Sequence, residues 1–133
     1  MKTFIHILTV STAMLLTSNS FANEEYSTTF KSCVEASQGA TDELNSCYSA
    51  EIKAQDFRLN SNYKKALNVL ANPQKQNLQN TQRTWIKFRD ADCGMYYSLT
   101  GGTIDLLNGA DCELSTTKKR ADDLAWIAEN GAE

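Results

Sequence analysis

A run of about 30 residues has helical spacing and contains no glycine or proline. Between residues 41 and 71, apolar side chains such as Leu44, Leu59, Leu67 and Leu70 recur at intervals that place them on one face of an α-helix. A helix of this length is roughly 45 Å long. A chain with such an element must cover it with other helices or a sheet.

Asn72 and Pro73 end this run. Proline disfavours helical geometry at the residue before it, yet it fits the first turn of a new helix. A further helix is therefore predicted from there to about Leu99, where Gly101 and Gly102 follow. Because the connection is so short, the two long helices are predicted to run antiparallel as a hairpin.

Two shorter helices complete the prediction. Tyr26, Phe30 and Val34 recur at i, i+4 and i+8 before Gly39, which indicates a short amphipathic helix. Residues 100–111 contain three glycines and are predicted to be a loop, so the last helix is expected only from about residue 112 or 115 to residue 127. The predicted fold class is all-α, a small antiparallel helical bundle built on a long helical hairpin.

Residues 1–22 have the pattern of a signal peptide. Lys2 supplies the positive start, residues 4–16 are apolar, and small residues precede a cut after Ala22. The apolar run is too short to span a membrane. We therefore expect one exported domain over residues 23–133, periplasmic or secreted, with no membrane insertion after cleavage.

Cleavage removes His6, the only histidine. The mature chain then carries 12 basic and 16 acidic residues, a net charge of −4, which argues against nucleic-acid binding and steers the protein weakly towards basic partners. Without histidine there is no Ser-His-Asp or Cys-His catalytic pair, no histidine metal ligand and no haem attachment motif. We expect no catalytic residue and no cofactor.

Four cysteines remain in the mature chain, an even number in an oxidising compartment, so two disulfides are expected. The favoured pairs are Cys33 with Cys47 and Cys93 with Cys112, each contributing roughly 3 kcal/mol by chain-entropy arithmetic. The pairing of Cys47 with Cys93 stays open if the hairpin is offset. The spacings of 14, 46 and 19 residues are unlike those of zinc sites, so no metal is expected.

The stretch 82–93 places large and charged side chains on one helical face. Gln82, Trp85 and Arg89 share this face. Counting along the hairpin from its turn places Asp56 opposite Arg89, or opposite Arg83 if the register differs by two turns. Because an unpaired buried charge is costly, we predict a structural ion pair between Asp56 and Arg89.

One ordered series of residues runs through most of the mature chain, namely Cys33, Cys47, Asp56, Leu59, Asn60, Tyr63, Leu78, Gln82, Arg83, Trp85, Phe88, Arg89, Asp90, Cys93, Gly101, Gly102, Thr103, Cys112, Thr117, Arg120 and Leu124. This series resembles that of the lysozyme inhibitor LprI-like family of small exported proteins. The resemblance implies a helical, disulfide-bonded exported domain without catalytic residues. It also implies a protein partner, a lysozyme.

We therefore expect an inhibitor that occupies the cleft of a lysozyme-type muramidase. A non-inhibitory accessory or immunity-like protein of the envelope is the alternative. A two-carboxylate glycosidase ranks third, because a thin helical hairpin offers little cleft.

The segment between Cys93 and Cys112 is the candidate partner-binding element. Its candidate residues are Gly101, Gly102, Thr103, Ile104 and Asp105. Glycines allow close backbone approach, and amide or hydroxyl donors can bind the two catalytic carboxyl groups of a lysozyme. The alternative is that this segment only caps the bundle, in which case the acidic face around Asp122 and Asp123 is the next candidate.

Overall fold

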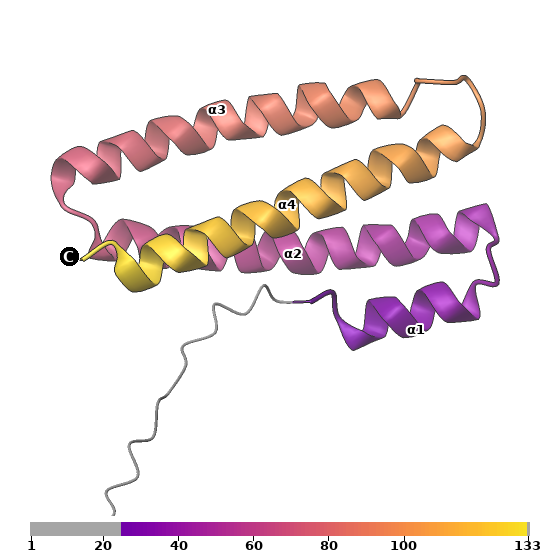
Figure 1. Cartoon of the computed structure of the whole chain (residues 1–133), viewed down its shortest axis with the longest axis horizontal. Coiled ribbons are helices and arrows are strands. Elements are labelled where there is room, and N and C mark those ends of the chain that lie inside the picture. The colour runs from indigo at the N-terminus through magenta and orange to yellow at the C-terminus, as the bar shows by residue number, and fades with distance from the viewer. Residues whose placement is uncertain (1–24, 133) are drawn as a thin grey trace, which may run out of the picture.

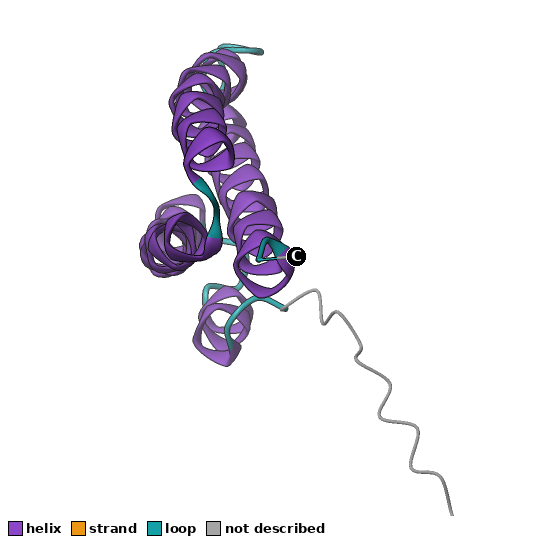
Figure 2. Ribbon diagram, turned by 90° about the vertical axis from the view of Figure 1, so that its left-hand side faces the viewer, coloured by secondary structure: helices purple, strands orange, loops and turns teal. Residues whose placement is uncertain are grey.

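The computed structural model describes residues 25–132 and contains four α-helices in that range. They are α1 (Thr28–Ala36), α2 (Thr41–Val69), α3 (Asn72–Tyr96) and α4 (Ile104–Asn130). Viewed along the helices, the described residues form helices and short connections without a strand (Figure 2). The all-α prediction is confirmed. The predicted signal peptide lies outside the described residues.

Helix α4 lies between α2 and α3, and α1 covers the other side of α2 (Figure 1). Helices α2 and α4 run in one direction, whereas α1 and α3 run in the opposite direction. The predicted antiparallel arrangement of α2 and α3 is therefore present. The main helix contact, however, is between α2 and α4, which are distant in sequence.

A seam of small and apolar residues explains the central place of α4. Ala110, Leu114, Thr117, Ala121 and Leu124 follow one another at steps of four and three residues, and all are buried. These steps place the side chains along a nearly parallel neighbouring helix, and the small side chains allow a close approach. The buried residues of α2 are Cys47, Glu51, Gln55, Leu59, Asn62 and Ala66.

Helix α4 begins earlier than predicted. The prediction of a loop as far as residue 111 is wrong, because the helix starts at Ile104 and continues through Gly109. A Cβ atom added to Gly109 would lie 2.3 Å from Cγ of Tyr97. The glycine therefore gives the Tyr97 ring room to lie on the helix, and it does not interrupt the helix.

Both predicted disulfides are confirmed. Cys33–Cys47 joins α1 to α2, and Cys93–Cys112 joins α3 to α4. In residues 25–132, one group of side chains has the proximity needed for a metal site, namely Asp92 with Cys93 and Cys112. Because these two sulfur atoms are bonded to each other, they do not offer the thiolates that such a site needs.

Helix α3 is held to α4 by residues of the series that carries the family resemblance. Nε of Arg120 donates to Oε1 of Gln82 at 2.9 Å. The guanidinium groups of Arg89 and Arg120 lie 5.2 and 5.9 Å from the Trp85 ring centroid, within cation–π range. Burial lowers the pKa of Arg120. The residues of this series that lie between α3 and α4 therefore serve the packing of these two helices.

Asp56 and Arg89 are neighbours, as predicted, but the contact is at the surface. Their closest charged atoms are 3.9 Å apart, and the Asp56 side chain is 50% exposed. Arg89 lies closer to Asp90, at 2.8 Å. The Arg89 side chain is mostly buried, at 19% exposed, but water reaches its half-exposed partner, so the contribution of this pair to stability is small.

Candidate protein-binding end

The loop of residues 97–103 lies at the end of the bundle where α2 and α4 begin (Figure 1). We call this loop, together with the first turns of α2 and α4, the loop end. All five residues predicted to bind a partner lie here. Gly101, Gly102, Thr103 and Ile104 are exposed, whereas Asp105 is only 3% exposed.

Asp105 organises the loop from inside. Its carboxylate accepts hydrogen bonds from the amides of Thr100 and Gly101, at 2.9 and 2.8 Å, and from the Thr100 hydroxyl at 2.8 Å. Burial by itself would raise the pKa of Asp105, but these hydrogen bonds outweigh burial and lower it. Gly101 has φ +76°, a conformation that favours glycine. Asp105 therefore shapes the loop, while its neighbours face outward.

Tyr97 braces the loop against α4. Its ring lies on Gly109, and its hydroxyl donates to the Glu113 carboxylate at 3.0 Å. Burial, together with the hydrogen bond and the charge of Glu113, raises the pKa of Tyr97 to about 12. With the Cys93–Cys112 disulfide below it, the loop is held in place before any partner arrives. A pre-ordered loop loses less conformational entropy on binding.

A pocket of about 310 Å³ lies between this loop and the start of α2. Its lining residues are Thr41, Asp42, Tyr97, Gly102, Thr103, Asp105 and Leu106. Three of these residues are among those predicted from the sequence, whereas the contribution of α2 was not predicted, because only the folded chain brings residue 41 beside residue 103. The pocket is large enough to receive a side chain of a partner protein.

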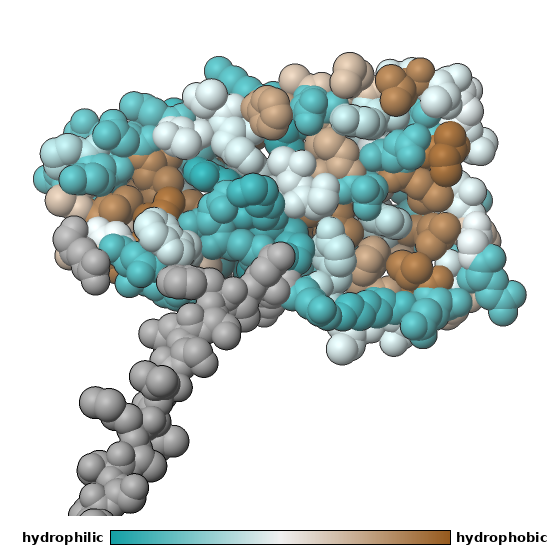
Figure 3. All heavy atoms as spheres, viewed as in Figure 1, coloured by the Kyte–Doolittle hydropathy of each residue, from teal (hydrophilic) through white to brown (hydrophobic). Residues whose placement is uncertain are grey.

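Apolar side chains surround the loop. Met95, Leu99, Ile104 and Leu106 are all exposed, Ile104 to 52%. Figure 3 shows hydrophobic side chains at the right-hand end of the molecule, where α3 ends and α4 begins. Exposed apolar groups that gather in one place are typical of protein-interaction surfaces.

The fold separates the charges of the chain into two halves. Residues 25–52 and 90–117, which meet in the half of the bundle at the loop end, hold ten acidic residues and one basic residue. We call this the acidic half. Residues 53–89, around the α2–α3 turn, hold eight basic residues and one acidic residue, and residues 118–132 beside them hold three of each. We call these two ranges together the basic half. This separation gives the loop end a negative field.

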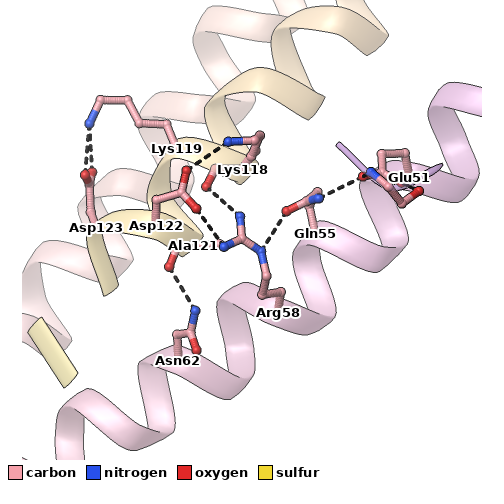
Figure 4. Close-up of polar contacts among 10 residues, drawn as sticks. Glu51, Gln55, Arg58, Asn62, Lys118, Lys119, Ala121, Asp122 and Asp123 are labelled. Atoms are coloured by element: carbon pink, nitrogen blue, oxygen red, sulfur yellow. Dashed lines mark hydrogen bonds and ion pairs between the residues drawn. The ribbon is translucent and has the colours of Figure 1, made fainter. Parts of the chain in front are cut away.

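The alternative acidic face on α4 is occupied by internal ion pairs. Asp122 lies 2.6 Å from Arg58 and 3.0 Å from Lys118, and Asp123 lies 2.9 Å from Lys119 (Figure 4). Charges that are paired within the protein are less available to a partner. The loop end is therefore the better candidate surface.

A polar network that was not predicted from the sequence continues from Arg58 along α2. Nε of Arg58 donates to Gln55, whose amide donates to Glu51 at 2.8 Å (Figure 4). Glu51 is buried and also accepts from the amide and hydroxyl of Ser27. Burial by itself would raise the pKa of Glu51, but the hydrogen bonds from Ser27 and Gln55 lower it. The signal in the sequence was polar residues at helical spacing on the buried face of α2.

The chain matches the family model described as lysozyme inhibitor LprI over residues 33–124. The matched range contains both disulfides and the whole loop of the loop end. No curated protein and no solved structure matches the chain. None of the helices in residues 25–132 combines the length and the apolar character needed to cross a bilayer.

Proposed function

The chain belongs to the lysozyme inhibitor LprI family, and we propose that it inhibits a lysozyme-type muramidase by binding at the enzyme cleft through its loop end. The observation that carries this proposal is the braced loop, which combines exposed hydrogen-bond donors with apolar side chains and neighbouring acidic residues. The family and the two disulfides support a location outside the cytoplasm, in the periplasm or as a secreted protein. We also propose that residues 1–22 are cleaved off as a signal peptide.

The donors of the loop match the chemistry of a lysozyme cleft. The amides of Thr103 and Ile104 lie at the start of α4, and they have no hydrogen-bond partner within the described residues. Free amides at a helix N-terminus favour carboxylates. A lysozyme cleaves its substrate with two carboxyl groups, so these amides and the Thr103 hydroxyl are suited to donate hydrogen bonds to those groups.

The charge separation supports the approach to the enzyme. Exposed acidic side chains at or beside the loop end include Asp42, Glu43 and Asp111. They attract a basic enzyme surface over several ångströms and orient the loop end towards it. The exposed Ile104 and Leu106 then supply apolar contact area at the centre.

A turbidity assay with the mature protein, a lysozyme and bacterial cell walls tests the proposal. We expect the protein to slow clearing in proportion to its concentration, and to do so less effectively as salt is raised. Clearing at the unimpeded rate across several lysozymes would contradict inhibition and favour the accessory or immunity-like role. Clearing by this protein alone would contradict the proposal that it is not an enzyme.

A further inference from the structure

The basic half contains cations that the protein itself does not neutralise. Lys53, Lys64, Lys65, Lys75 and Lys87 form no ion pair with any residue of the described range. All of them are exposed or partly exposed. Their positive charges are therefore available to a binding partner of the basic half.

One helical stripe joins these cations to an unexplained aromatic residue. Lys53, Phe57 and Lys64 follow at i, i+4 and i+11 on α2, on the side opposite the buried Leu59. Phe57 is 78% exposed, more than any other large hydrophobic side chain in residues 25–132. We call Lys53, Phe57 and Lys64 the outer stripe of α2.

We propose that the basic half binds an anionic lipid surface, with the outer stripe of α2 against the headgroups. The two lysines meet the phosphate groups, and the Phe57 ring enters the boundary between headgroups and acyl chains. A lipid surface fits better than a soluble polyanion, because only the lipid offers an apolar layer for Phe57. This inference does not depend on lysozyme inhibition.

The charge separation also sets the orientation on such a surface. Anionic headgroups attract the basic half and repel the acidic half, so α2 lies tilted on the surface and the loop end is lifted from the lipid. The partner-binding end then stays accessible while the protein is held at the surface. Each lysine contributes modestly, so the binding is reversible and sensitive to salt.

Co-sedimentation of the mature protein with lipid vesicles tests the proposal. We expect binding to phosphatidylcholine vesicles that contain about one-third phosphatidylglycerol, and none to phosphatidylcholine alone. The Lys53→Glu/Lys64→Glu variant should bind at least about tenfold more weakly. The Lys31→Glu/Lys119→Glu variant has the same net charge but leaves the outer stripe intact, and it should lose less than about threefold.

The Phe57→Ser variant distinguishes the contribution of ring insertion to vesicle binding from the contribution of the lysine charges. Because Phe57 is so exposed, this variant should keep the parent melting temperature and still bind anionic vesicles several-fold more weakly. Equal binding to neutral vesicles, or equal losses in the two charge variants, would overturn the proposal. Retention on an anionic polymer without binding to vesicles would also overturn it, in favour of a soluble polyanion.

Discussion

The carboxylate of Asp105 accepts a hydrogen bond of 2.8 Å from the amide of Gly101, four residues earlier in the chain. It also accepts a hydrogen bond from the amide of Thr100, so it takes the place of water as the partner of two loop amides. The loop conformation therefore depends on the charge of one buried side chain. This dependence can be tested separately from function.

Asp105→Asn should lower the melting temperature at neutral pH by several degrees. An asparagine amide would place a donor where the carboxylate accepts three hydrogen bonds, so at least one of these bonds is lost. Calorimetry of the parent and the variant measures the difference. An unchanged melting temperature would mean that Asp105 does not hold the loop.

The same residue gives a pH dependence of known sign. Folding lowers the pKa of Asp105 from its ordinary value of 3.8, so its contribution to stability is complete well above pH 3.8 and is lost as the pH falls through the lower folded value. In urea unfolding, the gap in free energy between the parent and Asp105→Asn should narrow below pH 3.8. A gap that stays constant into that range would contradict this assignment.

Gly109→Ala should destabilise the protein by about 1–3 kcal/mol, because the new methyl group would overlap the Tyr97 ring. Displacing the ring should also move the pKa of Tyr97 from about 12 towards the ordinary value of 10.0, which ultraviolet titration measures. Gly94→Ala is the matched control. Gly94 lies in α3 with no atom near its Cβ position, so alanine there should stabilise by about 0.5–1 kcal/mol.

Two ion pairs of α2 should differ in their importance. Asp56→Ala removes an exposed contact of 3.9 Å and should cost about 0–1 kcal/mol. Asp122→Ala removes the carboxylate shared by Arg58 and Lys118, which are mostly buried, and should cost about 2 kcal/mol or more. Equal losses in the free energy of unfolding, measured with urea, would show that solvent exposure does not determine how much each pair contributes.

Much of this fold follows from local rules. The long helix of α2 and its end before Pro73 follow from spacing and from the chemistry of proline, and the disulfides follow from an even cysteine count with short separations. The proximity of Asp56 to Arg89 follows from counting along the hairpin. Each of these inferences uses residues that are close in the chain or directly opposed across one turn.

The features that escaped prediction depend on contacts between distant segments. Gly109 is compatible with a helix here because Tyr97 covers it, and no local rule identifies that ring as its neighbour. The exposure of Asp56 depends on α4 being the main partner of α2, which counting along the α2–α3 hairpin does not reveal. Likewise, the pocket at the loop end needs Thr41 beside Thr103, residues from opposite halves of the chain.

The inhibition constant of an Ile104→Lys variant decides whether the loop end is the lysozyme-binding surface. Ile104 is 52% exposed at the loop end, so the melting temperature should not change, whereas inhibition of a basic lysozyme should weaken at least about tenfold. Phe57→Lys, the same change at an exposed site in the basic half, should inhibit like the parent. Full inhibition by Ile104→Lys, with loss in Phe57→Lys, would contradict the assignment of the loop end as the lysozyme-binding surface.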